Sequence, residues 1–252
     1  MSLLVADGIT MRFSGITALD HVSIDVAEGE VVGLIGPNGA GKTTFFNCLL
    51  GILRPDHGRV EFDGRDLTRV PTHRRARMGI ARTFQRIELF SGMTPREHFL
   101  VTERVRSGSG ALWKDLLFRG RPTAAERAAA DEMLELLGLG PVADRAVESL
   151  SLGTGRLVEI GRALMTRPRL VLFDEPSSGL DRSETADLAE RLRTVQQERG
   201  IAILLVEHDV ELVRELVTRV FVLDFGTVIA SGPTDSVFDD SAVRRAYLGD
   251  VV

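Results

Sequence analysis

The sequence predicts an α/β fold built around a parallel sheet. Four short apolar runs lack the polar alternation of a strand that faces water on one side, which is typical of parallel strands covered on both faces. Helical patterns follow three of these runs, as in βαβ units. The runs are EVVGLIG (30–36), GIARTFQ (79–85), RLVLFDE (169–175) and IAILLVEH (201–208). Because parallel strands end at a common edge of the sheet, we expect the residues that follow them to form one site.

The amino-terminal part predicts a different kind of β-structure. LLVADGITMRF (3–13) and HVSIDVAEGE (21–30) alternate apolar and polar residues, which favours antiparallel strands. After the first apolar run, a helix with a core-facing stripe is predicted from the spacing of Phe46, Leu49, Leu50 and Leu53.

Between the second and third apolar runs the pattern is mostly helical, with an interruption at RSGSGAL (106–112). Thr123 and Glu126 form a capping box, and the helix that they open is expected to stop at Gly138. LSLGTGRLVEIGRAL (150–164) begins with a serine and two glycines and continues with a helical stripe formed by Leu157, Ile160, Gly161 and Leu164.

A further helix is expected after Asp181, which pairs with Glu184 as a helix start and places Leu188, Leu192 and Val195 toward the core. Taken together, the elements predict a single domain. Its core comprises about 1–90 and 165–252, and a helical subdomain is inserted at about 91–164.

Composition narrows the function classes. With 252 residues, 44% of them hydrophobic, the chain can bury a substantial core. Its net charge of −5 does not favour general electrostatic binding to nucleic acid or anionic lipid. The single cysteine, Cys48, rules out an internal disulfide and a cysteine metal cluster and fits a reducing compartment. The longest apolar run, 201–206, is far shorter than the roughly 20 residues that span a bilayer, and no signal-peptide pattern precedes it. We therefore expect a soluble, cytoplasmic chain.

A phosphate-binding loop is the most specific motif. Residues 36–43, GPNGAGKT, satisfy G-x-x-x-x-G-K-[ST] between a predicted strand and a predicted helix. The glycines allow successive N–H groups to point at phosphates, Lys42 neutralises the terminal ones, and Thr43 is placed to ligate magnesium. The alternative is an ordinary strand-to-helix turn, but a chance match in a chain of this length has a probability of about 1%. The absence of G-x-G-x-x-G argues against a dinucleotide fold.

Three further strand ends carry candidate residues. Asp174 is placed to hold the magnesium shell, and Glu175 to orient or deprotonate an attacking water. An Asp–Glu pair after a strand is more often a solvated turn, but its occurrence downstream of a phosphate loop favours the catalytic interpretation. His208 could contact a γ-phosphate or be an ordinary surface or core histidine, and Gln85 could act on magnesium or on the water. His21, His57, His73 and His98 lack the spacing of metal ligands.

In this order, the motifs resemble those of ATP-binding cassette (ABC) ATPases over essentially the whole chain. The resemblance implies ATP and Mg²⁺ as ligands and a P-loop NTPase (RecA-like) core with an antiparallel β subdomain and an inserted helical subdomain. It makes Gln85 the Q-loop, 150–154 the signature, 170–174 the Walker B strand with Glu175 as catalytic base, 178–181 the D-loop with Asp181, and His208 the switch histidine. The corresponding Walker A residues are Gly36, Pro37, Asn38, Gly39, Ala40, Gly41, Lys42, Thr43 and Thr44.

The resemblance narrows to the ATP-binding subunits of branched-chain amino acid importers. The stretches that carry it are MRFSGITALDHVS (11–23), ARTFQRIELFSGMTPREH (81–98), LLVEHDVELV (204–213) and RAYLG (245–249). It implies a homodimer, or a heterodimer with a paralogous subunit, that is coupled to membrane permease subunits through residues 85–99 and indirectly to a secreted solute-binding protein. It also implies a peripheral place on the inner face of the membrane and no nucleic-acid partner.

The same family explains the second glycine-opened helix start. In ABC ATPases each nucleotide lies between the phosphate loop of one subunit and the signature of the other, so Ser151 and the N–H groups near Gly153 would face the γ-phosphate of the partner's ATP. The signature here is LSLGT in place of LSGGQ, which puts Thr154 where the family has glutamine. Phe13 stands where a tyrosine usually stacks on adenine, and a core role for it is the alternative.

Three other functions are compatible with parts of the sequence. One is a related cassette for another cargo, such as urea, short amides or an exported lipid. Another is a soluble ABC ATPase of translation or of DNA, which the single phosphate loop and the absence of sustained heptads disfavour. The third is an ATP-binding regulator without catalysis, disfavoured by the presence of Glu175 and His208.

Overall fold

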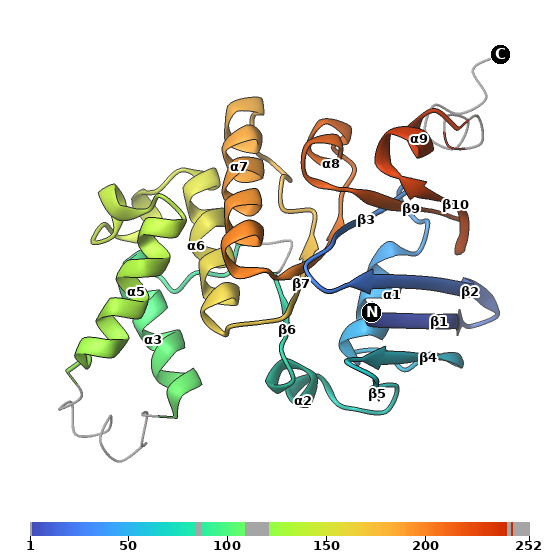
Figure 1. The fold of residues 1–252 in the computed structure, drawn as a ribbon, viewed down its shortest axis with the longest axis horizontal. Helices are drawn as coiled ribbons and strands as arrows, with labels where there is room; N and C mark the ends of the chain where they lie inside the picture. The colour runs from blue at the N-terminus through green and yellow to red at the C-terminus, as the bar shows by residue number, and fades with distance from the viewer. Residues whose placement is uncertain (1, 84–86, 109–120, 241–242, 244–252) are drawn as a thin grey trace.

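The computed structural model describes residues 2–83, 87–108, 121–240 and 243. Its strands form two sheets (Figure 1). The antiparallel sheet has the order β2-β1-β4-β5, made of β1 (Ser2–Phe13), β2 (Ile16–Ala27), β4 (His57–Phe62) and β5 (Arg65–Asp66). The amino-terminal antiparallel strands predicted from the sequence are therefore confirmed.

The second sheet has the order β10-β9-β3-β8-β7-β6, and all its pairs are parallel except β10 with β9. Its strands are β3 (Val31–Ile35), β6 (Ile80–Arg82), β7 (Leu170–Asp174), β8 (Ala202–Val206), β9 (Arg219–Asp224) and β10 (Thr227–Pro233). The four apolar runs correspond to β3, β6, β7 and β8, which confirms the predicted parallel sheet.

The central parallel strands are mostly apolar because both faces of the sheet are covered. Every residue of β7 is buried, and successive side chains point to opposite faces. Val171 and Phe173 join one core cluster, whereas Leu170 and Leu172 join the other. The first cluster contains residues of α6 (Leu152–Met165) and α7 (Arg182–Arg199), and the second those of α1 (Lys42–Leu50). This two-sided core holds the carboxyl ends of the strands at one edge.

Helices α3 (Pro95–Ser107), α5 (Ala124–Leu136) and α6 lie together at the end of the molecule away from the antiparallel sheet (Figure 1). Gly161 allows α3 to approach α6 closely, because a Cβ there would lie 2.4 Å from Cζ of Phe99. Between α5 and α6 lie two short 3-10 turns, Gly140–Val142 and Val147–Ser149. The division into core and helical subdomain near residues 91 and 164 stays a prediction.

Local helix signals are confirmed, with one correction. The capping boxes at Thr123 and Asp181 are present, and both open helices at the expected residues. The prediction that the helix reaches Leu53 is wrong. Helix α1 ends at Leu50, where Gly51 takes the left-handed conformation (φ 72°). Leu53 still packs against the same core from beyond the helix. The remaining short helices are α2 (Thr72–Arg77), α8 (Val210–Leu216) and α9 (Thr234–Phe238).

The carboxyl end of α1 is held by a buried arginine on α2. Arg75 is 1% exposed, and its guanidinium donates to the carbonyls of Cys48 and Leu49 in the last turn of α1, which contains no basic residue of its own. It also donates to two carbonyls of the preceding segment, those of Leu67 and Val70. Burial lowers the pKa of Arg75 from its ordinary value. The positive charge thus lies at the negative end of the phosphate-loop helix.

Replacing Arg75 by methionine is expected to lower the free energy of unfolding by about 2 to 4 kcal/mol, because buried carbonyls lose their donors. Urea unfolding followed by circular dichroism measures this. Arg74 is exposed on the same helix, so the matched change Arg74→Met should alter stability by no more than about 0.5 kcal/mol. Equal stabilities for the two variants would contradict the capping role of Arg75.

Candidate functional site

The sheet brings three of the four predicted segments to one edge. Strands β7, β8 and β3 are neighbours, and the acidic pair, His208 and the phosphate loop follow their carboxyl ends. The loops after β7 and β8 are tied directly, because the backbone N–H of Glu175 donates to the carbonyl of Val206 at 2.9 Å. The fourth residue, Gln85, lies outside the described residues.

The phosphate loop requires glycine at its two ends. A Cβ at Gly36 would lie 2.0 Å from the carbonyl oxygen of Leu223, and one at Gly41 would lie 2.7 Å from that of Ala18. Both residues have positive φ, 153° and 107°. The loop is thus pressed between β9 and β2, and its backbone takes a path that other residues would not allow.

Lys42 lies inside the curve of this loop. Its Nζ donates to the carbonyls of Gly36 at 2.6 Å and Pro37 at 3.0 Å, and the residue is 6% exposed. Burial lowers the pKa of Lys42, while the carboxylates of Glu175 and Asp174 oppose that shift. A positive charge is therefore held at the position where the loop would surround the terminal phosphates.

The helix that follows the loop begins without a cap. Gly41 is the N-cap of α1, no side chain accepts from its first turn, and that turn has no acidic residue. Among the described helices of seven or more residues, the others each have a side-chain N-cap. Free N–H groups at a positive helix end fit an anion, so the residues present suit a nucleotide's phosphates.

Asp174 is a buried carboxylate rather than a solvated turn residue. It is 5% exposed, and its Oδ2 accepts from Nη2 of Arg82 at 2.9 Å. Burial raises the pKa of Asp174, and the charge of Arg82 opposes this. Arg82, at the carboxyl end of β6, was not predicted as a site residue, although a basic residue at that strand edge was visible in the sequence.

The predicted magnesium ligands have suitable chemistry. A carboxylate of Asp174 and a hydroxyl of Thr43 are hard oxygen ligands of the kind that Mg²⁺ prefers. Within the described ranges, no group of three or more His, Cys, Asp or Glu residues could hold a metal ion. Mg²⁺ in nucleotide sites is usually held by one or two protein oxygens together with phosphate oxygens and water, and Thr43 and Asp174 would supply the protein oxygens.

Glu175 and His208 lie at the carboxyl edge of the parallel sheet, Glu175 in the loop after β7 and His208 in the loop after β8. Glu175 has φ 48°, a left-handed conformation that is costly for a residue with a side chain and occurs often at active sites. The side chain of His208 is 58% exposed, and its Nδ1 lies 3.9 Å from Oε2 of Glu207, too far for a hydrogen bond. The ring is thus open to a ligand.

The signature residues form a second cluster around Glu184. Ser151 is the N-cap of α6, and its Oγ accepts from the N–H of Thr154 at 3.2 Å. The N–H of Gly153 donates to Oε1 of Glu184 at 3.3 Å, and Oε2 of the same carboxylate accepts from the N–H of Asp181 at 3.4 Å. The starts of α6 and α7 are thereby linked. A Cβ at residue 153 would lie 2.9 Å from Glu184 Oε1, so a larger residue there would displace this carboxylate from the N–H of Gly153.

Phe13 ends β1 and is 41% exposed, so it is not a core residue. An exposed aromatic face is what stacking on a base requires.

Comparison with known proteins decides the family. Residues 19–178 match the sequence profile of a family described as ABC transporter. The chain belongs to this family. It is thus an ABC ATPase, a protein that binds and hydrolyses ATP.

Full-length relatives support this assignment. The ABC ATPase is 40% identical over 252 residues to the high-affinity branched-chain amino acid transport ATP-binding protein LivG of Salmonella typhimurium, with 98% of each chain covered. It is 34% identical to the lipopolysaccharide export system ATP-binding protein LptB of Haemophilus influenzae, covering 99% of this chain and 98% of LptB. The crystal structure of the ADP conformation of MJ1267, an ATP-binding cassette of an ABC transporter, superposes with a TM-score of 0.85 at 33% identity over 99% of this chain and 100% of that one.

The ABC ATPase thus has two groups of predicted residues. The phosphate loop, Asp174, Glu175 and His208 share the sheet edge. Gly153 and Asp181 are joined through Glu184, and Ser151 caps the helix that contains Gly153. Sequence reasoning missed Arg82, Glu184 and Glu207. Glu184 was noted only as a helix-capping residue, and nothing in its local pattern indicated a contact with the signature.

Proposed function

We propose that this ABC ATPase is the ATP-hydrolysing subunit of an importer for branched-chain amino acids. The observation that carries the proposal is the 40% identity to LivG over nearly the whole of both chains. Identity to LptB is lower, so lipid export is the weaker alternative. Because LivG is named as the ATP-binding protein of a transport system, we place this chain on the inner face of the membrane, attached through permease subunits. Among the described helices none is both long and apolar enough to cross a bilayer.

Two copies, or this chain and a paralogue, would form each complete site. Helix α6 lies with α3 and α5, apart from α1 (Figure 1), which supports a nucleotide held between the phosphate loop of one subunit and the signature of the other. Lys42 and the N–H groups of α1 would hold the phosphates from one side. Ser151 and the N–H of Gly153 would approach the γ-phosphate from the partner. ADP lacks that phosphate, so the dimer would close with ATP and reopen after hydrolysis.

Within the site, each side chain has one task. Glu175 accepts a proton from the attacking water, and His208 contacts the γ-phosphate. Thr43 and Asp174, with Gln85, would hold Mg²⁺, which neutralises phosphate charge. Phe13 would stack on adenine, and Asp181 would belong to the loop that contacts the partner subunit.

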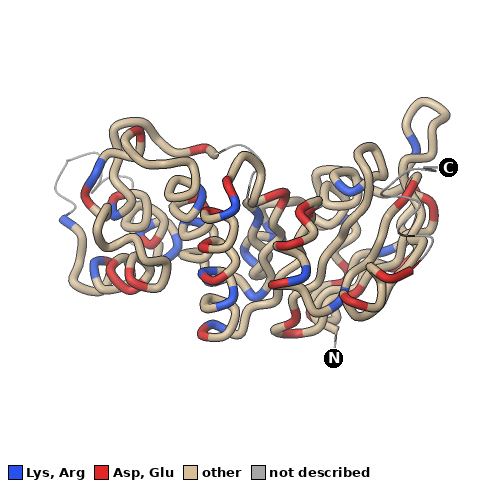
Figure 2. The backbone as a smooth tube through the Cα atoms, turned by 90° about the horizontal axis from the view of Figure 1, so that it is seen from above, with Lys and Arg blue, Asp and Glu red and all other residues tan. Residues whose placement is uncertain are grey.

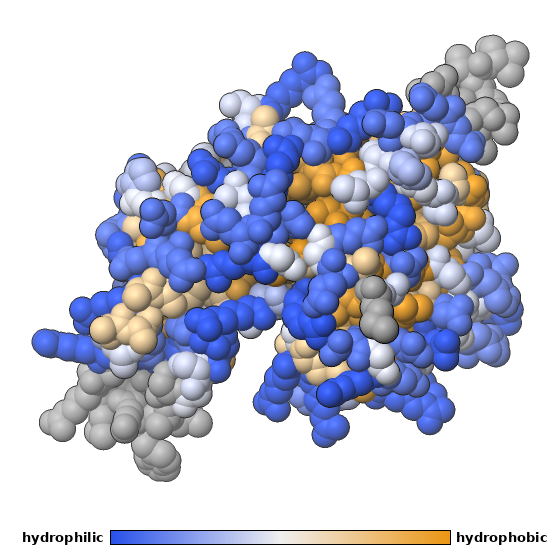
Figure 3. Space-filling view, viewed as in Figure 1, coloured by the Kyte–Doolittle hydropathy of each residue, from blue (hydrophilic) through white to orange (hydrophobic). Residues whose placement is uncertain are grey.

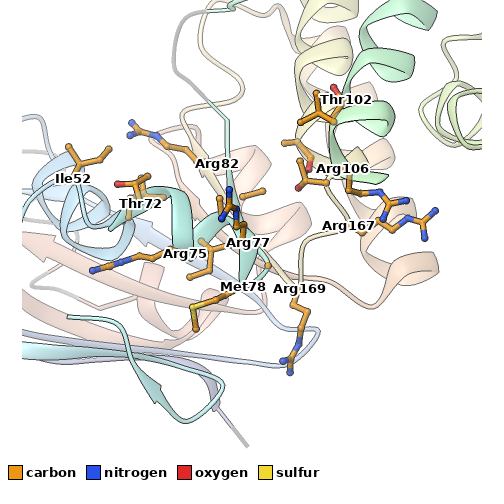
Figure 4. Close-up of a pocket in the computed structure, with 18 residues that line it drawn as sticks. Ile52, Thr72, Arg75, Arg77, Met78, Arg82, Thr102, Arg106, Arg167 and Arg169 are labelled. Carbon is orange, nitrogen blue, oxygen red and sulfur yellow. The ribbon is translucent and has the colours of Figure 1, made fainter. Parts of the chain in front are cut away.

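A groove of about 920 Å³ supports docking of a permease segment. It lies between α2 and β6 on one side and α3 and α6 on the other, where Figure 3 shows the lower edge hollowed. The predicted coupling segment 85–99 joins β6 to α3. The groove combines apolar residues such as Ile52 and Val105 with several arginines (Figure 4): Arg75, Arg77, Arg82, Arg106, Arg167 and Arg169. Arg75 is buried and Arg82 pairs with Asp174, so the exposed Arg77 and Arg167 are the arginines that would meet acidic residues of a short, partly apolar helix. Over the rest of the backbone, acidic and basic residues are interspersed (Figure 2).

Reconstitution tests the cargo. The ATPase would be purified with candidate permease and secreted binding-protein subunits and placed in proteoliposomes. We expect leucine, isoleucine or valine, with the binding protein, to raise ATP turnover by more than about tenfold, because closure of the ATPase dimer is coupled to the loaded permease. Urea, short amides and lipid extracts serve as the control solutes. Assembly with and without a paralogous subunit tests whether the ATPase works as a homodimer or a heterodimer.

Stimulation by urea, an amide or lipid, but by none of the three amino acids, would contradict the cargo while leaving the ATPase assignment standing. Stimulation by RNA or DNA in the absence of permease would contradict the transport role itself.

A further inference from the structure

A buried carboxylate that the mechanism above does not use lies directly beside the hydrolytic residues. Glu207 follows β8, immediately precedes His208, and is 0% exposed. Among the described residues, the basic side chain within ion-pair distance is that of His208, whose Nδ1 lies 3.9 Å away. A buried carboxylate costs several kcal/mol unless its oxygens are well bonded.

Backbone N–H groups from two separate loops supply those bonds. Oε1 of Glu207 accepts from the N–H of Ser177 at 2.9 Å. Oε2 accepts from the N–H groups of His208 at 3.0 Å and Asp209 at 3.3 Å. Hydrogen bonds to an ionised acceptor are about twice as strong as neutral ones. One side chain therefore joins the loop after β7 to the loop after β8.

The two loops carry the proposed catalytic groups. Ser177 lies two residues after Glu175 and just before the D-loop residues 178–181. On the other loop, His208 lies between Glu207 and Asp209, and Asp209 is itself fixed as the N-cap of α8 through the N–H groups of Glu211 and Leu212. Hydrogen bonds to Glu207 and to the start of α8 thus fix the backbone that carries the exposed ring of His208.

We propose that Glu207 is a positioning residue for ATP hydrolysis. It fixes the spacing between the loop of Glu175 and the loop of His208, and it transmits to both any movement of the D-loop. This inference rests on the proposed roles of Glu175 and His208. A carboxylate is required because three donors converge on two acceptor atoms, and an amide would place its own NH₂ donors against one of the loops.

The test is Glu207→Gln in the full chain. We expect kcat for ATP hydrolysis to fall by about 10- to 100-fold, because a displacement of about 1 Å in a catalytic group has effects of this size. KM and the Kd for ATP should stay within about threefold, since the phosphate loop is untouched. Glu190 is exposed on α7, so Glu190→Gln is the matched control and should leave both constants unchanged.

A double-mutant cycle separates positioning from a general loss of stability. If Glu207 acts through His208, Glu207→Gln should cost much less in a His208→Ala background than in the wild type, because coupled residues are not additive. Additive losses, an unchanged kcat, or a fall in ATP affinity as large as the fall in kcat would each overturn the proposal.

Hydrogen exchange in the wild-type protein provides a readout that does not depend on a variant folding. The amides of Ser177, His208 and Asp209 should exchange slowly without nucleotide, and exchange as fast as that of unbonded loop amides would overturn the proposal. Failure here is distinct from failure of the proposed function. Normal turnover in Glu175→Gln would reject the assigned base, whereas normal turnover in Glu207→Gln alone would reject only the positioning role.

Discussion

Glu175→Gln is expected to reduce ATP turnover by at least about a hundredfold while ATP binding stays within about threefold. The amide cannot accept a proton from the attacking water, and its similar shape leaves the phosphate loop unchanged. The backbone at residue 175 is held by the carbonyl of Val206, so the substitution should not displace the neighbouring groups.

The same variant should accumulate a closed dimer with ATP, because the γ-phosphate that joins the two subunits is not removed. Phosphate release measures turnover, a fluorescent nucleotide measures binding, and size-exclusion chromatography with and without ATP measures the dimer. Glu198 is exposed on α7, and Glu198→Gln serves as the matched control. Wild-type turnover in Glu175→Gln would show that another group is the base, and a monomer in saturating ATP would contradict the proposed shared site.

Lys42→Met should weaken ATP binding by at least about a hundredfold, because a buried, charge-assisted contact to phosphate is worth about 3 kcal/mol or more. Lys42 Nζ is held by the carbonyls of Gly36 and Pro37 inside the loop. Burial lowers its pKa, which means that the charged form is disfavoured where it lies. Removal of the buried charge should partly offset the loss of the donor to these two carbonyls, so the free energy of unfolding should change by no more than about 2 kcal/mol in the absence of nucleotide.

Isothermal titration calorimetry with ATP measures the affinity. Urea unfolding measures the free energy of unfolding separately. Arg54 is an exposed cation just beyond α1, so Arg54→Met removes the same charge near the loop and should keep wild-type affinity. Tight ATP binding by Lys42→Met would contradict the assigned phosphate contact. A large loss of stability would show that the lysine is primarily structural.

Much of the fold could be predicted because its signals are local. The capping box at Thr123, the helix start at Asp181 and the fully apolar run of β7 each depend on residues within one or two turns of one another. The convergence of β3, β7 and β8 followed from a general property of parallel sheets. The extension of α1 to Leu53 failed because periodicity continued past a residue, Gly51, that the backbone uses to end the helix.

The site was predictable where one short motif contains the whole arrangement, as in the phosphate loop. It was not predictable where the arrangement joins distant residues. Arg82 and Asp174 are 92 residues apart in the chain, Gly153 and Glu184 are 31 apart, and Ser177 and Glu207 are 30 apart. Glu207 looked in sequence like one more polar residue beside a histidine.

The sequence by itself indicated the four apolar strands, several helix starts, the family and a candidate phosphate-binding loop, since each depends on short-range spacing and residue type. Only the tertiary structure decided which charges are buried and what each one touches. The reason is physical. The orientation of a side chain at the end of a strand depends on the neighbouring loop, and that neighbour is chosen by the packing of the whole sheet.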